Sequence, residues 1–344
     1  MLGISGKKLH HWYKSVLSGF ETASAQQSLH EHDLQVKNPR GVKEIIQVPI
    51  LKPQNMGKHM AIDEKNIAGK CFTILTNRET GKISLMANTL IARHLHRLGL
   101  KLGDTCFEVE SLTRDLANNY DWLGRQLFMN AEHIGDKFHI LRHGFDALQS
   151  VRIRLRQQEL THQRLTRENH RRLEQEKKKL FKEKGLTYRV QKYKEELLQN
   201  GDTKAQLLVR SRYLLFKFKS DWTTEQEQRA KLLFKLYPAI KTAYTLISRF
   251  RKWYDKKQVG KSLNLKTTQL NKWYQAVRKQ KIEEVENFAD LVKRHEGVTL
   301  NYFKNGFTNA YAESLNAKIQ RMLSKGHGTK NLDFFLFRIK ILFA

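Results

Sequence analysis

The spacing of apolar residues changes character near residue 150. Before that point, short apolar runs alternate with turn residues and amphipathic stretches, which predicts an α/β fold with a mixed sheet and helices packed on it. After it, apolar positions follow helical spacing alone, so we expect only helices. The predicted strands are 60–64, 71–76, 83–86, 106–109 and 131–134, and the predicted helices before residue 150 are 89–100, 118–128 and one from 138.

The helices expected beyond residue 150 are strongly charged. Residues 151–184 hold 12 Lys or Arg and five Asp or Glu, with few apolar positions. This pattern is typical of a solvated helical arm, and the alternative is a helix laid along DNA phosphates. Trp222, Trp253 and Trp273 follow among basic residues, where core packing is favoured over stacking on an unpaired base. Further helices are expected at 207–217, 224–236 (with Thr223 and Gln226 as a capping box), 239–253, 268–278 and 283–295.

The charge balance points to a polyanionic partner. Lys and Arg total 63 against 34 Asp and Glu, a formal net charge of +29 in 344 residues, which attracts phosphate backbones at long range. No apolar run approaches the roughly 20 residues that span a bilayer, and the first residues lack a signal-peptide core, so we expect a cytoplasmic, nucleoid-associated protein. Cys71 and Cys106, each in a strand-like segment, are expected to be buried thiols.

Acidic residues stand at three predicted element ends in the first half of the chain. Asp63 is expected to end the strand 60–64. Asp115 follows the predicted strand 106–109 after a polar turn at 111–114, and a helix N-cap is the alternative role for it. Asp136 and His139, where a strand meets a helix, share a helix face and can hydrogen-bond one another or reach a metal site.

A helix near the C-terminus has one polar and one apolar face. Thr308 can cap it, and Asn309, Glu313, Asn316 and Gln320 recur at spacings of four, three and four residues, while Ala312, Leu315, Ile319 and Leu323 line another face. A carboxylate between two amides, with Lys318 and Arg321 near by, suits a metal ligand beside a substrate phosphate. Clustered carboxylates in so basic a chain are reasonable if divalent metal ions lie between them and a polyanion.

Several separated segments, in one order, resemble the bacterial insertion-sequence DDE transposases, most closely the group called ISL-three. They span roughly residues 58–343 and read AIDE at 61–64, D at 115, NAE at 130–132, DKFHI at 136–140, LLVRSRYLLFK at 207–217, LNYF at 300–303 and TNAYAESLNAKI at 308–319. The resemblance implies an RNase H-like fold with Asp63, Asp115 and Glu313 as the acidic triad. It also implies that Asp136 and His139 form the D-x-x-H signature of this branch.

The resemblance also implies how the chain is divided. We expect an N-terminal arm or domain remnant at 1–56, the first part of an RNase H-like core at 57–150, an all-helical insertion at 151–298 and the C-terminal core helices at 299–344. The chain departs from the family at Met129, where relatives have Pro, and after Asp115. It also shows neither the zinc ribbon nor the helix-turn-helix of longer relatives, some of which encode that region separately.

These observations lead to a specific hypothesis for the chemistry. Two Mg²⁺ or Mn²⁺ ions, about 3.5 to 4 Å apart, would be shared by Asp63 and held by Asp115 and Glu313. DNA would be cut at the element ends and the 3′-OH joined to target DNA by a homodimer, with a separately encoded DNA-binding protein as a further partner. Asn309 and Asn316 would orient Glu313 or the scissile phosphate, and the expected DNA contacts are Lys318, Arg321, Arg210 and Arg212. The alternatives are a non-catalytic DNA-binding transposase remnant and another RNase H-like nuclease, such as a junction resolvase.

Overall fold

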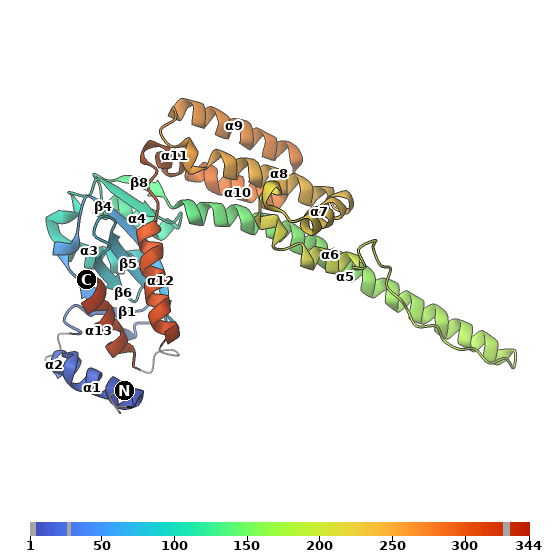
Figure 1. The fold of residues 1–344 in the computed structure, drawn as a ribbon, viewed down its shortest axis with the longest axis horizontal. Coiled ribbons are helices and arrows are strands. Elements are labelled where there is room, and N and C mark those ends of the chain that lie inside the picture. The colour runs from blue at the N-terminus through green and yellow to red at the C-terminus, as the bar shows by residue number, and fades with distance from the viewer. Residues whose placement is uncertain (1–4, 26–28, 326–330) are drawn as a thin grey trace. The chain divides into compact units, whose positions relative to one another are not determined.

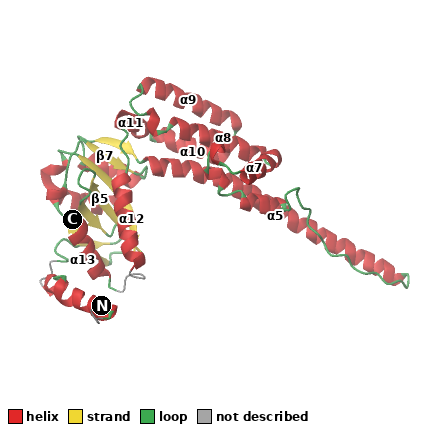
Figure 2. Ribbon diagram, viewed as in Figure 1, coloured by secondary structure: helices red, strands yellow, loops and turns green. Residues whose placement is uncertain are grey.

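The computed structural model describes residues 5–25, 29–325 and 331–344. They form two compact units: Met1–Ile140 with His295–Ala344, and Leu141–Arg294. The first holds all strands of the described residues and the second is helical (Figure 2). The domain boundaries expected from the sequence stay predictions.

A six-stranded mixed sheet organises the first unit. Its order is β3-β6-β5-β4-β7-β8, with antiparallel pairing from β3 to β4 and parallel pairing from β4 through β7 to β8. Helices flank it, so the α/β, RNase H-like fold expected from the resemblance is confirmed (Figure 1). The strands are β3 (Ile50–Leu51), β4 (His59–Ile67), β5 (Lys70–Asn77), β6 (Ile83–Ala87), β7 (Ser111–Arg114) and β8 (Glu132–Gly135).

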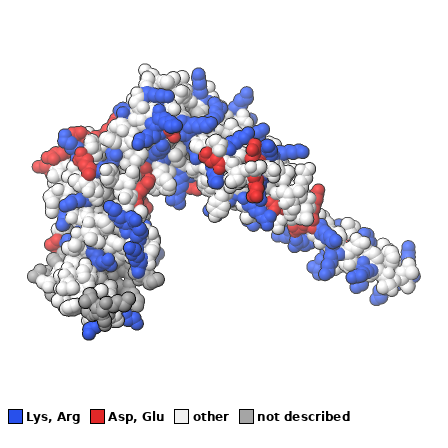
Figure 3. Space-filling model, in the orientation of Figure 1, with Lys and Arg blue, Asp and Glu red and all other residues white. Residues whose placement is uncertain are grey.

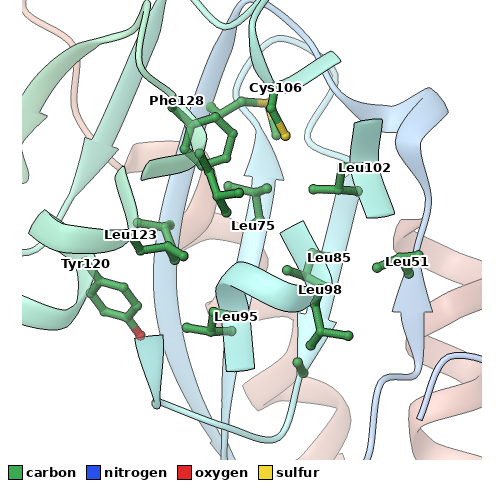
Figure 4. Packing of buried hydrophobic residues seen from close by; sticks show 14 of the residues in the cluster. Leu51, Leu75, Leu85, Leu95, Leu98, Leu102, Cys106, Tyr120, Leu123 and Phe128 are labelled. Atoms are coloured by element: carbon green, nitrogen blue, oxygen red, sulfur yellow. The ribbon is translucent and has the colours of Figure 1, made fainter. Parts of the chain in front are cut away.

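Each face of this sheet carries its own apolar core, because successive side chains of a strand point to opposite faces. On one face, α3 (Ala92–Gly99) and α4 (Asn118–Leu127) bring Leu95, Leu98 and Leu123 against Leu75 and Leu85 (Figure 4). On the other, the strand neighbours Ile74 and Met86 join a cluster with residues of α12 (Ala310–Lys325) and α13 (Leu332–Phe343). Residues of α12 therefore lie on one defined face of the sheet.

The N-terminal 56 residues contribute to this unit. Strands β1 (Leu34–Lys37) and β2 (Lys43–Ile46) form a separate hairpin, from which Leu34, Val36 and Ile46 enter the larger core cluster. Ahead of them lie α1 (Gly6–Trp12), a π-helical turn (Tyr13–Leu17) and α2 (Phe20–Ala25). The Phe20 ring lies edge-on to Phe334 of α13. The first 56 residues thus include part of the fold's apolar core.

The predicted strand at 106–109 is wrong. A 3-10 helix, η3 (Leu100–Cys106), occupies its start, with Cys106 buried at the helix end, and the strand lies instead at Ser111–Arg114, where a polar turn was predicted. The reason is that β7 is buried on both sides between β4 and β8. Three of its four residues are polar, so its composition resembles a turn, and Ser111 and Arg114 have the partners His59 and Asp121 inside the unit.

Three smaller expectations also fail. Asp63 does not end its strand, because the β4–β5 hairpin continues to the pair Ile67 and Lys70. Asp115 does not cap the following helix, since Ala117 is the N-cap of α4. The helix predicted at 207–217 ends early, because α6 (Lys204–Arg210) is followed by the 3-10 turn η4 (Leu214–Phe216).

The second unit is built from the helices expected there. Helix α5 (Lys137–Glu183) continues into it, and the predicted capping box of α7 is present, with Thr223 and Gln226 exchanging hydrogen bonds. The indole N–H groups of Trp222, Trp253 and Trp273 each donate a hydrogen bond to a backbone carbonyl, and Trp273 is buried. Both observations agree with core packing. The remaining helices are α7 (Thr224–Leu236), α8 (Pro238–Trp253), α9 (Leu263–Gln280) and α10 (Glu283–Arg294).

The far part of α5 is paired with the chain segment that follows it. Glu174 accepts hydrogen bonds from the Tyr188 hydroxyl (2.8 Å) and the Gln191 amide (2.8 Å), and Arg167 pairs with Glu195. Leu165, Leu173 and Leu180 are about half exposed, as expected of a solvated arm. Within the described ranges, no helix is long and apolar enough to cross a membrane.

Candidate active site

Strand register places three acids level with one another. In the parallel ladder, Ala61 of β4 pairs with Thr113 of β7, and Thr113 pairs with Ile134 of β8. Two residues further along each chain segment stand Asp63, Asp115 and Asp136. Because the three strands run parallel, Asp63 within β4 lies level with the carboxyl ends of β7 and β8, which Asp115 and Asp136 directly follow. Asp63 and Asp136, 73 positions apart in the sequence, therefore stand at the same level of the sheet.

Helix α12 brings its polar face to the same strand. The Asn316 side-chain amide donates to Asp63 Oδ2 at 2.7 Å, and Lys65 Nζ donates to Gln320 Oε1 at 2.9 Å. The neighbouring apolar face packs as predicted, with Ala312, Leu315 and Ile319 buried. The helix begins at Ala310, so Asn309 rather than Thr308 directly precedes it, and Thr308 Oγ1 accepts a hydrogen bond from the Ala310 amide (3.4 Å). Glu313, one turn before Asn316, thus belongs to the helix face that meets β4.

The acids act on one another electrostatically. Burial raises the pKa of Asp63 above its usual value, the Glu64 amide and the His139 charge oppose this, and the charges of Asp136 and Asp115 add to it. Burial also raises the pKa of Glu313, with the Asp136 and Asp63 charges adding to the effect. Like charges held close together disfavour ionisation unless a cation offsets them. These five side chains form one electrostatic group, which we call the acidic cluster: Asp63, Asp115, Asp136, His139 and Glu313.

Asp136 and His139 form the hydrogen bond expected from their spacing. Asp136 is fully buried after β8, and its Oδ2 lies 2.6 Å from His139 Nδ1 at the start of α5. The hydrogen bond to Asp136 raises the pKa of His139 to about 9, against a burial effect that lowers it. The pair therefore places an imidazolium beside three carboxylates.

This pair makes a testable contribution to stability. A pKa raised on folding stabilises the protein fully below the unfolded value of about 6.5, and that stabilisation is lost as pH rises through about 9. Against His139→Gln, wild-type protein is expected to lose up to roughly 3 kcal/mol of unfolding free energy across that window. Urea unfolding from pH 6 to 10, with a chelator present, measures the difference. Parallel stability curves for the two proteins would contradict it.

Of the other predicted residues, some lie near the cluster and some lie elsewhere. Asn309 is buried, with its amide nitrogen 3.4 Å from the Ile62 carbonyl, and its Oδ1 has no partner within the described part of the chain. Lys318 and Arg321 are exposed on α12. Arg210 and Arg212 belong to the second unit, where Arg210 pairs with the buried Asp202 and Arg212 lies over the Tyr213 ring.

Sequence reasoning missed Arg114, which anchors the backbone beside Asp115. Its guanidinium is fully buried, pairs with Asp121 of α4 and donates from Nη1 to the Asp115 carbonyl at 3.0 Å. The pKa of Arg114 is lowered by burial, an effect that the Asp121 charge opposes. Because residues 111–114 were predicted to be a polar turn, nothing in the sequence indicates that Arg114 is buried there.

The donor atoms of the cluster suit a hard divalent cation. Carboxylate and amide oxygens are the ligands that Mg²⁺ and Mn²⁺ prefer, and the buried, unpartnered Asn309 Oδ1 is a further oxygen of this kind. In the described residues, no three His, Cys, Asp or Glu side chains are arranged closely enough to hold an ion as they stand. The chemistry therefore fits a metal, and a bound cation would offset the repulsion among the acids.

Comparison with known proteins identifies the family. Among curated proteins none matches the chain. One solved structure, the Drosophila P element transposase strand transfer complex, is similar at 12% identity over 82% of this chain and 76% of that chain, with a TM-score of 0.35, a likeness too low to carry an argument. The family model described as Transposase, of the DDE type and the ISL3 group, matches residues 60–339. The chain therefore belongs to the ISL3 (ISL-three) family of DDE transposases.

Proposed function

We propose that this transposase cuts DNA at insertion-sequence ends and joins the freed 3′-OH to target DNA by metal-dependent phosphoryl transfer at Asp63, Asp115 and Glu313. The observation that carries the proposal is the strand register that sets Asp63 level with Asp115, beside a helix that carries Glu313. Membership of the DDE transposases implies an enzyme that acts on DNA and requires a divalent metal. The proposal assigns that chemistry to named side chains.

Asp63, Asp115 and Glu313 would hold the Mg²⁺ or Mn²⁺ ions. When bound, such ions activate the attacking oxygen and stabilise charge on the phosphate and the leaving oxygen. Asn316 holds the Asp63 carboxylate in place through its hydrogen bond, so it acts as a positioning residue. Asp136 fixes the His139 ring, which places a positive charge near the acids in the absence of metal.

The remaining predicted residues have roles in orientation and DNA contact. Asn309, buried at the start of α12 with a free oxygen, would orient Glu313 or the scissile phosphate. Lys318 and Arg321 are exposed on the helix that carries Glu313, which suits contacts to phosphates flanking the cleavage site. Arg210 and Arg212 are proposed as further DNA contacts. A homodimer would hold two element ends together, and a separately encoded protein would supply end recognition.

A cleavage and joining assay tests the proposal. Wild-type protein is incubated with labelled DNA from the ends flanking the gene, with Mn²⁺, Mg²⁺ or a chelator, and with or without a neighbouring gene's product. We expect nicking only with divalent metal, and joining of a precut 3′-OH end to plasmid DNA. Salt-sensitive DNA binding without cleavage in any condition would favour the non-catalytic remnant. Cleavage without joining would favour another RNase H-like nuclease.

A further inference from the structure

Two adjacent hollows in the second unit share one wall. The larger, of about 570 Å³, is lined by α8 and by the 3-10 turns η5 (Lys219–Asp221) and η6 (Lys256–Gln258). The smaller, of about 330 Å³, is lined by α8 and α9. Arg249 and Lys252 of α8 line both hollows, and so does Gln258. The two hollows are therefore neighbours with two cationic side chains between them.

The sequence of α8 explains why these cations face outward. The helix buries Ala243, Leu246, Ile247 and Phe250 in the unit's core. Thr245, Arg249 and Lys252, at spacings of four and three residues, form an exposed face of the same helix. The hollows therefore lie on a rigid element whose opposite side is anchored by packing.

The walls of the hollows carry an unbalanced positive charge. Five cations line them, against the single carboxylate of Asp255, which accepts a hydrogen bond from the Lys257 amide: Lys219, Arg249, Lys252, Lys257 and Lys272. Across the described chain none of the five has a carboxylate partner, and the nearest ring contact is Lys252 over Phe218 at 5.9 Å. Elsewhere in this unit Arg154 and Arg278 are paired with acids. Figure 3 shows how widely Lys and Arg occur on the visible surface.

We infer that the paired hollows hold successive backbone phosphates of a DNA strand, one on each side of the wall formed by Arg249 and Lys252. The inference rests on the proposed function, which supplies DNA as the substrate, and it adds a binding site outside the acidic cluster. Two hollows that share a cationic wall suit a repeating polyanion better than a single small anion. The half-buried Trp253 ring in the wall of the smaller hollow offers apolar surface to a sugar or base.

The test measures DNA binding in a chelator, so that cleavage cannot contribute. Full-length Arg249→Ala/Lys252→Ala protein is compared with wild type by fluorescence anisotropy on an element-end duplex and an unrelated duplex, from 50 to 300 mM salt. Loss of two phosphate contacts is expected to lower the slope of log affinity against log salt by about 1.8. The loss of affinity should be equal on both duplexes, because phosphate contacts carry no sequence information.

A matched control removes two other exposed cations of the same unit, Lys235→Ala/Lys241→Ala, and is expected to leave the slope at the wild-type value. An equal reduction of the salt slope in the two double variants would overturn the inference in favour of diffuse electrostatic attraction. So would saturable binding of inorganic phosphate or ATP that the Arg249 and Lys252 changes abolish while DNA affinity stays unchanged. If the Arg249→Ala/Lys252→Ala variant binds DNA more weakly but wild-type protein does not cleave, only the proposed chemistry is rejected. If wild-type protein cleaves and the variant binds and cleaves DNA as wild type does, only this site is rejected.

Discussion

Asp63→Asn is expected to lower metal-dependent nicking of element-end DNA by at least about 10³-fold, which corresponds to roughly 4 kcal/mol of activation free energy. Asp63 is the acid that the register sets beside Asp115 and that Asn316 holds in position. The amide keeps the size of the side chain but removes the charge that would bind a cation. Initial rates in Mn²⁺, with DNA affinity measured separately in chelator, isolate the chemical step from binding.

The neighbouring Glu64 provides a matched control for this substitution. It follows Asp63 directly on β4, is exposed and accepts a hydrogen bond from the Tyr120 hydroxyl, which a glutamine oxygen can also accept. Glu64→Gln is therefore expected to nick DNA at close to the wild-type rate. If Asp63→Asn cleaved as fast as Glu64→Gln, the assignment of Asp63 to the chemistry would be rejected.

Asp121→Asn is expected to destabilise the protein by about 3 kcal/mol, because it leaves the guanidinium of Arg114 buried without its counter-charge. The Arg114 side chain has no exposed surface, and Asp121 is 23% exposed, so the effect should fall at the low end of the range for buried pairs. Urea unfolding at pH 7 measures it. Since Arg114 also donates to the Asp115 carbonyl, nicking activity is expected to fall as well.

Arg125 provides a control that distinguishes the effect of the buried ion pair from that of an ordinary surface ion pair. It contacts the same carboxylate at 3.0 Å but is 69% exposed, so Arg125→Gln is expected to cost less than about 1 kcal/mol. The double variant Arg114→Met/Asp121→Leu should recover much of the stability lost in Asp121→Asn, because neither charge is then buried alone. A similar cost for Arg125→Gln and Asp121→Asn would show that the burial of Arg114 does not decide the effect.

Much of the fold followed from the sequence because its apolar runs are locally consistent. Strands β4, β5 and β6 carry β-branched and aromatic residues between turn residues, and α7 begins with a capping box, so local signals sufficed. Strand β7 could not be predicted, because Ser111, Thr113 and Arg114 are polar and are buried by the pairing of β7 with β4 on one side and β8 on the other. Tertiary contacts there override local propensity.

The candidate site was predictable only in part, for the same reason. The spacing of Asp136 and His139 predicted their hydrogen bond, and the periodicity of α12 predicted which of its faces packs. The pairing of Ala61 with Thr113, which sets Asp63 level with Asp115, depends on a parallel ladder between segments about 50 residues apart. No local pattern encodes that register. The roles of Asp63, Asp115 and Glu313 in the reaction stay predictions.

The position of α12 in the chain has a consequence during protein synthesis. Three acids of the cluster come from the first 140 residues, whereas Glu313 follows the entire second unit. On a ribosome that adds about 5 to 20 residues per second, the strands emerge many seconds before this helix. Under the proposed assignment, a nascent chain can fold its sheet and still lack the last ligand. Such an incomplete chain would then be unable to cut DNA.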